Sequence, residues 1–218
     1  MKKTAVKIDN FVKIYEKSFI ENWELPALTD YVTQKTMTYA DMATAIAKIH
    51  LYFDSIGLSK GDKVALCGKD SVNWVLIYMA TVTYGAVIVP ILSEFNPVDV
   101  THIVNHSEAK IFFVSKAVWE PMEPDALLNL RGALSIDDFH LLLERDGDRL
   151  CHHLRQLTRR FRRIYPKGYT SEDIRYPDVS NDAIAEINYT SGTTGFSKGV
   201  MLTGENLAGN VCFGMETE

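Results

Sequence analysis

The spacing of apolar and polar residues along the chain predicts an amphipathic helix early in the sequence. Between Thr38 and Ile56, apolar residues recur every three or four positions, which places them on one face of an α-helix. Thr38 is a suitable N-cap, and Gly57 is a suitable residue to end the helix. We therefore expect a capped helix that packs one face against the rest of the molecule.

From Lys60 the pattern changes to short apolar runs separated by helical segments. The runs at residues 63–67, 86–90 and 111–114 predict strands, and the segments at 71–84 and 97–105 predict helices. The first of these helices is apolar on all sides and is therefore expected to be buried, while Asn96 and Pro97 mark the start of the second. Gly85 is expected to end the buried helix, and Pro90 to end the strand that follows it. Strands that alternate with helices predict a parallel sheet with right-handed crossovers, in a single α/β unit.

The pattern is less clear between residues 121 and 182. Residues 121–134 give mixed signals, and leucines at helical spacing predict one long helical stretch over 136–163, ending in the basic run Arg159–Arg163. We interpret this run as a solvated face neutralised by Asp137, Asp138, Glu144, Asp146 and Asp148, although contact with phosphate, membrane headgroups or nucleic acid is the alternative. Residues 166–182 are rich in Pro, Gly, Ser and Asp, which indicates a long surface connection.

Composition and charge favour a globular protein with a small-molecule partner. The 218 residues are 46% hydrophobic and 23% charged, which is typical of a chain with a real core. The formal net charge is -5, and basic residues are interspersed with acidic ones, so no nucleic-acid partner is expected.

Cysteine and histidine spacing give no indication of a disulfide framework or a metal site. The three cysteines, Cys67, Cys151 and Cys212, are widely spaced and lack a CxxC pair. His102 and His106 are four residues apart, but no glutamate of an H-E-x-x-H site lies between them, and His152 and His153 are adjacent. No apolar run behind the N-terminal lysines is long enough for a signal peptide or a membrane span. We expect a soluble, cytoplasmic protein without a transmembrane segment.

The stretch Tyr189–Gly199 carries the strongest chemical signal in the chain. Six hydroxyl-bearing or glycine residues in a row are followed closely by a lysine: Thr190, Ser191, Gly192, Thr193, Thr194, Gly195 and Lys198. Glycines let backbone N–H groups approach an anion, hydroxyls donate hydrogen bonds, and lysine supplies a compact positive charge. Because the apolar segments 183–188 and 200–203 flank the stretch and are predicted strands, we interpret it as a phosphate-binding loop between two strands.

Two other interpretations of this loop are disfavoured. The Walker A spacing G-x-x-x-x-G-K-[ST] fails, because Lys198 comes three residues after Gly195 and Gly199 follows the lysine. A flexible Ser/Gly linker would also have this composition. A linker, however, has no reason to lie between two apolar strands with a lysine at its end.

The string YTSGTTGFSKG, followed by VMLT, resembles the signature loop of the AMP-forming adenylating enzymes. This superfamily includes acyl-CoA synthetases, nonribosomal peptide adenylation domains and firefly luciferase. Residues 37–42, with Thr38, Tyr39 and Asp41, resemble the first core motif of the family, and residues 80–90 resemble its second. One departure is Ser197, where the family usually has proline before the lysine, so the local backbone is less restrained.

The resemblance implies an α/β fold, the N-terminal part of the large domain of an adenylate-forming enzyme, and an ATP-dependent ligase activity. In the family, a carboxylate attacks the α-phosphate of ATP to give an acyl-adenylate, and the acyl group usually passes to coenzyme A. On this basis Ser191, Gly192, Thr193, Thr194 and Gly195 would donate to the phosphates and Lys198 would neutralise the pyrophosphate. Thr190 would help to hold Mg²⁺. The motif flanks are more similar to long-chain fatty acid–CoA ligases than to amino-acid-activating domains, which favours a fatty acid substrate.

Later motifs of the family have no match in this sequence. The aromatic-Gly-x-Thr-Glu run, the Thr-Gly-Asp that binds ribose and the C-terminal catalytic lysine are all missing. Residues 1–218 are therefore expected to be an incomplete N-terminal portion of the AMP-binding domain that is inactive alone. The alternatives are a non-catalytic nucleotide-binding or interaction module from a truncated paralogue and, disfavoured by the failed Walker spacing, a phosphate-loop kinase or NTPase.

Overall fold

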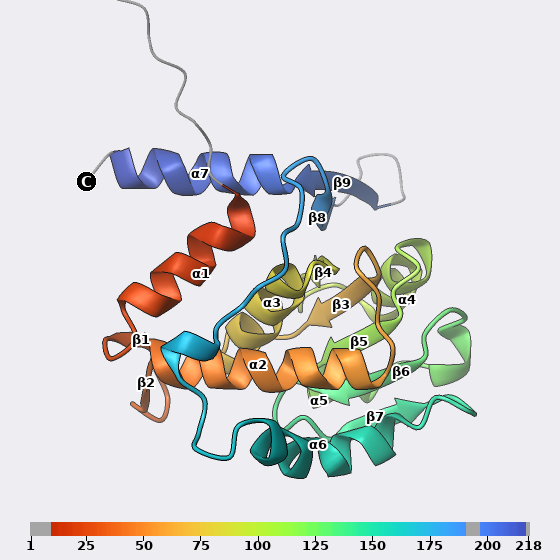
Figure 1. Ribbon diagram of the computed structural model, residues 1–218. Coiled ribbons are helices and arrows are strands. Elements are labelled where there is room, and N and C mark those ends of the chain that lie inside the picture. The colour runs from red at the N-terminus through yellow and green to blue at the C-terminus, as the bar shows by residue number, and fades with distance from the viewer. Residues whose placement is uncertain (1–9, 191–196, 217–218) are drawn as a thin grey trace, which may run out of the picture.

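A computed structural model describes residues 10–190 and 197–216, and its elements alternate between strands and helices through the centre of the chain (Figure 1). The strands are β1 (Pro26–Thr29), β2 (Thr36–Thr38), β3 (Lys63–Cys67), β4 (Val87–Ile91), β5 (Ile111–Val114), β6 (Gly132–Ser135), β7 (Leu141–Glu144), β8 (Ile184–Thr190) and β9 (Lys198–Thr203). The α-helices are α1 (Phe11–Glu21), α2 (Tyr39–Ser55), α3 (Val72–Tyr84), α4 (Pro97–His106), α5 (Lys116–Trp119), α6 (Leu150–Ile164) and α7 (Gly204–Glu216). Two short 3₁₀ helices are η1 (Pro124–Ala126) and η2 (Ser171–Asp173).

The centre of the molecule is a seven-stranded sheet with the order β7-β6-β5-β3-β4-β8-β9. The neighbours from β6 to β8 pair in parallel, and the two edge strands, β7 and β9, pair antiparallel with β6 and β8. A separate two-stranded hairpin is formed by β1 and β2, which the hydrophobic pattern did not predict. The predicted parallel α/β fold is confirmed.

Helices cover both faces of this sheet, so its central strands are buried on each side. On one face, Ile46 and Phe53 of α2 and Ile77 of α3 belong to the same cluster as Leu66 and Phe113 of the sheet. On the other face, Val100 and Ile103 of α4 pack in a second cluster with Ala65, Val89 and Phe112. Alternate residues of each strand thus enter opposite cores, as the two-residue period of a strand requires.

The helix boundaries follow the caps that the sequence predicted. The side chain of Thr38 accepts a hydrogen bond from the Asp41 N–H at 3.1 Å, and the Asp41 carboxylate accepts one from the Thr38 N–H at 3.0 Å. This reciprocal capping box fixes the start of α2. Gly85 has a φ of 88° at the end of α3, a left-handed conformation that favours glycine.

Pro90 does not end its strand, contrary to expectation. It lies inside β4, opposite Leu66 of β3, and the strand continues to Ile91. Pairing of β4 with β8 occurs at Ile88 and Glu186, ahead of the proline. A proline is tolerated in a strand where no neighbour needs its missing N–H.

The single long helix expected over residues 136–163 is wrong in its first half. Residues 136–139 form a turn in which Phe139 has a φ of 57° and the Asp138 side chain accepts from the His140 N–H. The leucines that follow form β7, which pairs antiparallel with β6, and only α6 is helical. A short apolar run fits a strand as well as a helix, and here pairing with β6 decides the outcome.

The connection from α6 to β8 lies along the surface, as predicted, but it also anchors the N-terminal helix (Figure 1). Its side chains Ile174 and Tyr176 are buried. The Tyr176 N–H donates to the Glu16 carboxylate at 2.5 Å, and the Asn10 side chain donates to the Val179 carbonyl at 2.6 Å. No helix in the described part of the chain is long and apolar enough to cross a membrane.

Candidate functional site

The β8–β9 hairpin brings together the two described ends of the predicted phosphate loop. Thr190 is the last residue of β8, Lys198 is the first residue of β9, and the two are register partners in the antiparallel ladder. Both are exposed. Ser191, Gly192, Thr193, Thr194 and Gly195 lie outside the described residues.

A cleft of about 800 Å³ opens beside Thr190, at the carboxyl ends of β3, β4 and β8. Three strand ends and one helix contribute its lining: Gly68, Lys69 and Asp70 after β3, Pro90, Ile91, Leu92, Ser93 and Glu94 around the end of β4, Asn188, Tyr189 and Thr190 of β8, and Trp74 of α3. Its volume is within the range usual for small-molecule sites. Ligands of open α/β sheets bind at this edge.

The strand order places a topological switch point at this cleft. The chain leaving β4 crosses back past β3 to reach β5, whereas the chain leaving β8 turns outward to the edge strand β9 (Figure 1). The outgoing connections therefore diverge between β4 and β8. A crevice of this kind is the expected ligand position in a doubly wound sheet.

Tyr189 holds the base of the hairpin against α4. Its ring is 8% exposed, and its Oη lies 2.7 Å from Nδ1 of His106, in the last turn of α4. Gly199 pairs with Tyr189, and a Cβ at Gly199 would lie 3.2 Å from the tyrosine ring and 3.0 Å from Ile187. Burial raises the pKa of Tyr189, which keeps its hydroxyl protonated. The ring and its hydrogen bond thus fix the strand that leads directly into the loop.

On the opposite face of the sheet, a line of aromatic contacts joins the cleft to β8. Trp74, which lines the cleft, stacks on Tyr78 with ring centroids 5.5 Å apart. The Tyr78 hydroxyl donates to the buried Glu186 carboxylate at 2.5 Å. Burial and then this carboxylate raise the pKa of Tyr78, so the tyrosine remains a donor.

The polar groups of the cleft fit a phosphate-bound cation better than a protein-built metal site. Asp70 and Glu94 supply carboxylates in the lining, and Thr190 supplies a hydroxyl. Within the described residues, no three His, Cys, Asp or Glu side chains are grouped so as to hold a metal ion. Magnesium commonly takes one or two protein oxygens and completes its shell with substrate phosphates and water, which these residues can accommodate.

The two histidine pairs considered as possible metal ligands contact aromatic rings. His102 and His106 lie with ring centroids 5.5 Å apart, and His106 contacts Tyr189. His152 and His153 are perpendicular neighbours on α6.

The basic run at the end of α6 is mostly exposed, and several of the acidic residues upstream contact other groups. Arg159, Arg162 and Arg163 are exposed, and Arg160 donates to the Ser55 hydroxyl. Two of the acidic residues pair with other cations, namely Asp138 with Lys116 and Asp148 with Arg131. The Glu144 side chain accepts from the Cys151 N–H at the start of α6. The run is thus mostly solvated, as expected, and Asp138, Glu144 and Asp148 contact other groups instead of neutralising it.

The sequence pointed to the loop but not to its supporting residues. Residues 37–42, which resemble the first core motif of the family, form the cap of α2 and do not line the cleft. Residues 80–90, which resemble the second, end at Pro90, and Pro90 lines the cleft. Trp74 and Glu94 in the lining were missed. Their signal was their position just after β3 and β4, because polar or aromatic residues that follow parallel strands gather at one edge.

Comparison with known proteins agrees with this architecture. The AMP-binding enzyme family model matches residues 18–218. The chain is 25% identical over 185 residues to a luciferin 4-monooxygenase of Photuris pensylvanica, covering 83% of this chain and 32% of that protein. It is 22% identical over 224 residues to a long-chain-fatty-acid–CoA ligase of Yersinia pestis, covering 94% of this chain and 38% of that protein. The chain thus spans less than half the length of these relatives.

Solved structures give the same fold. The long-chain-fatty-acid–CoA ligase of Archaeoglobus fulgidus superposes with a TM-score of 0.71 at 21% identity, covering 96% of this chain and 39% of that one. The fold and the family that the motifs indicated are both confirmed. Since the family model covers nearly the whole chain, the chain belongs to the AMP-binding enzyme family.

Proposed function

We propose that this chain supplies the phosphate-binding wall of an ATP-dependent ligase that converts a carboxylic acid to an acyl-adenylate and then to an acyl-CoA thioester. The observation that carries the proposal is the register pairing of Thr190 with Lys198 beside the cleft at the carboxyl ends of β3, β4 and β8. This pairing holds a hydroxyl and an ammonium at the two ends of the loop. Both groups suit an anionic ligand.

In this proposal the chain acts by positioning and by stabilising charge. The backbone and hydroxyl groups of Ser191, Gly192, Thr193, Thr194 and Gly195 donate to the β- and γ-phosphates of ATP, and Lys198 balances the charge that develops on the pyrophosphate. The Thr190 hydroxyl helps to hold Mg²⁺, which shields the phosphate charge when bound. Tyr189 and His106 fix the strand from which these residues extend.

A fatty acid is the proposed acid, and coenzyme A is the proposed acceptor. Long-chain-fatty-acid–CoA ligases among the relatives support this choice. The described cysteines, Cys67 and Cys151, are free thiols, which supports a reducing compartment such as the cytoplasm.

We also propose that residues 1–218 form an incomplete N-terminal portion of the AMP-binding domain and do not catalyse adenylation alone. The support is that the chain spans only 32% and 38% of two relatives, and that the later motifs which the family resemblance implies have no match in its sequence. Isotope exchange between ATP and pyrophosphate by the isolated 218-residue chain, with any fatty acid, would contradict this.

The test of the site is Lys198→Ala in the protein that the full gene encodes. Loss of one well-placed charge stabiliser commonly costs about 2.7–4 kcal/mol of barrier, so ATP–pyrophosphate exchange should fall by about 10²–10³-fold. Lys167→Ala, an exposed lysine in the connection after α6, is the matched control and should leave the rate unchanged. An unchanged rate in Lys198→Ala would remove this lysine from the mechanism.

A further inference from the structure

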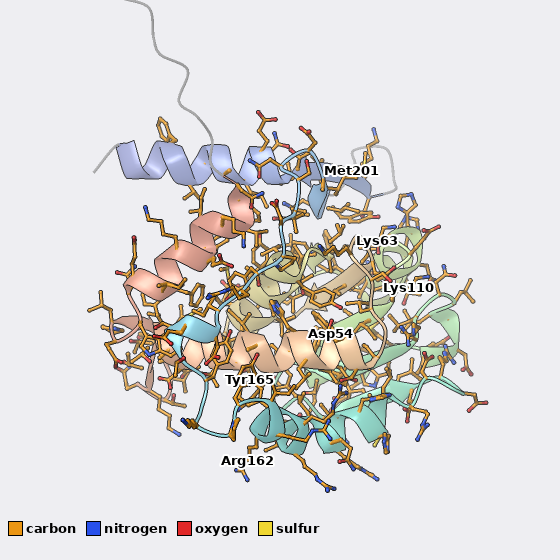
Figure 2. All side chains as sticks on the ribbon, viewed as in Figure 1. Asp54, Lys63, Lys110, Arg162, Tyr165 and Met201 are labelled. Atoms are coloured by element: carbon orange, nitrogen blue, oxygen red, sulfur yellow. The ribbon has the colours of Figure 1, made fainter. Side chains whose placement is uncertain are left out.

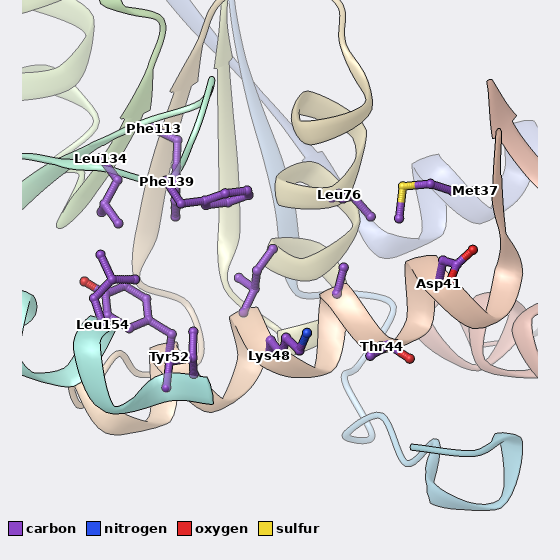
Figure 3. Close-up of a pocket in the computed structure, with 13 residues that line it drawn as sticks. Met37, Asp41, Thr44, Lys48, Tyr52, Leu76, Phe113, Leu134, Phe139 and Leu154 are labelled. Atoms are coloured by element: carbon purple, nitrogen blue, oxygen red, sulfur yellow. The ribbon is translucent and has the colours of Figure 1, made fainter. Parts of the chain in front are cut away.

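A second cavity, of about 480 Å³, runs along α2 on the sheet face that carries α2 and α6 (Figure 3). One stripe of α2 lines it, formed by Asp41, Thr44, Ala45, Lys48, Ile49 and Tyr52. Asp41 and Tyr52 are eleven positions apart, which is about 16 Å along the helix, so the cavity is a long groove. It shares no lining residue with the cleft beside Thr190, so it is a separate site.

The floor and far wall of this α2 groove are apolar. Leu76 of α3, Phe113 of β5 and Phe139 of the turn before β7 face α2 across the groove. Leu157 of α6 also lines it. Thr44 and Ala45, in the α2 stripe, are small residues. Sites of this volume with predominantly apolar walls and a few polar groups are typical of small-molecule pockets.

A more polar cavity of about 410 Å³ adjoins the groove, and Lys48 lines both. Arg162 and Tyr165, near the C-terminal end of α6, line this second cavity (Figure 2). The Lys48 ammonium lies 5.4 Å from the centre of the Phe161 ring. Among the described residues neither Lys48 nor Arg162 has a carboxylate partner within ion-pair distance.

The one carboxylate in the lining, that of Asp41, lies at one end of the α2 stripe, away from Lys48. Asp41 is seven residues before Lys48, about 10 Å along the helix, and its carboxylate is engaged by the Thr38 N–H and hydroxyl in the capping box. The groove therefore has apolar walls and a carboxylate already in use at one end. Lys48 lies near its middle, where the cavity lined by Arg162 adjoins it, and neither cation has a carboxylate partner among the described residues.

We propose that the α2 groove and the adjoining cavity bind a single-chain amphiphile with an anionic head group. The apolar chain occupies the groove between α2 and Leu76, Phe139 and Leu157, and the head group meets Lys48 and Arg162. The charge complementarity selects an anion, and the narrow apolar body selects one alkyl chain. This site does not depend on the phosphate loop, and it is distinct from the proposed reaction site.

Calorimetric titration of the 218-residue chain, without nucleotide, tests this binding. The probes are octanoate, decanoate, decyl phosphate and decyltrimethylammonium. We expect both ten-carbon anions to bind, decanoate to bind more tightly than octanoate by about fourfold for each added methylene, and the cation not to bind. Decanoate and decyl phosphate separate a carboxylate from a phosphate head group. Binding that is equal for the anions and the cation, or no binding at all, would overturn the proposal.

Three variants locate the site. Ala45→Trp fills the groove and should abolish binding of decanoate, and Lys48→Met keeps the apolar stem but should weaken it by about tenfold. Arg159→Ala removes an exposed cation of α6 that lines neither cavity, and this variant should bind as the unaltered chain does. Circular dichroism checks that each variant is folded.

A covalent probe gives a result even if Ala45→Trp does not fold. Decanoate with a photoreactive diazirine on its terminal carbon should label peptides that contain Leu76, Phe139 or Leu157 of the unaltered chain. Labelling confined to other segments would contradict the assignment. Lys198→Ala should leave binding unchanged, so failure of the proposed ligase activity and failure of this site are distinguishable.

Discussion

At the scale of single residues, the pairing of Tyr189 with His106 shows what the loop requires from the rest of the sheet. A tyrosine next to a Ser/Thr/Gly run was visible in the sequence. Its hydrogen-bond partner, His106, was not visible, because it lies 83 residues earlier. The spacing of His106 from His102 indicated only a possible pair of metal ligands. Spatial partners from different elements leave no periodic signal, so only the fold reveals them.

We predict that Tyr189→Phe and His106→Ala each lower the free energy of unfolding by about 0.5–1.5 kcal/mol, the usual net contribution of one hydrogen bond. The phenylalanine ring still packs over Gly199, so the loss measures the hydroxyl. Urea unfolding of both single variants and the double variant tests this. The double variant should lose less than the sum of the two single losses; strict additivity would show that the residues do not interact.

At the scale of elements, the caps predicted the helices well, whereas leucine-rich runs did not distinguish strand from helix. Asn96 and Thr38 mark helix starts because their side chains accept a hydrogen bond from an N–H of the first turn. Pro97 marks one because its fixed φ suits the first helical position. The leucines of β7 instead depend on β6 as a partner. The β1–β2 hairpin was missed because its strands are short and only partly buried.

The contact of α2 with α3 contains a histidine, His50, which should make the stability of the fold sensitive to acid. The His50 Nε2 lies 2.9 Å from the Ala80 carbonyl and 3.1 Å from the Thr83 hydroxyl, and its ring lies between Tyr84 and Tyr176. Burial lowers the pKa of His50 to about 4, against the opposing effects of the Ala80 carbonyl and Asp54. Because the unfolded chain takes up this proton near pH 6.5, stability falls as the pH drops from about 6.5 toward 4.

We expect this effect to be on the order of 1–3 kcal/mol of the unfolding free energy between pH 7 and pH 4. Urea unfolding at several pH values measures it. His50→Gln lacks the titrating group and should show a flatter pH dependence, while His152→Gln, an exposed control, should keep the original dependence. Equal slopes for His50→Gln and the unaltered chain would rule out His50 as the cause.

At the scale of the whole molecule, the parallel sheet and its two covered faces followed from the alternation of apolar runs and helices. The strand order did not follow, because nothing in the local pattern shows that β8 inserts beside β4. The cleft depends on that strand order, because the order brings the carboxyl ends of β3, β4 and β8 to one edge of the sheet. Its position therefore could not be predicted from the local sequence pattern.

We predict that a chain ending at Asp182 will associate in solution. Without β8, the buried strand β4 becomes the edge of the sheet and exposes its unpaired backbone groups. Size-exclusion chromatography should show oligomers or aggregates. A chain ending at Thr203 keeps the β8–β9 hairpin and should associate less; a monodisperse product from the shorter chain would contradict the role of β8.

The insertion of β8 beside β4 also sets an order of events during synthesis. Ile88 and Glu186 pair across about 100 residues of sequence, which a ribosome translates in roughly 5–20 s. Loop closure over such a separation is slower than the local pairing of β3 with β4. The nascent chain therefore carries an incomplete sheet for several seconds, and the strand that leads into the proposed phosphate loop is also the one that completes folding of the parallel core.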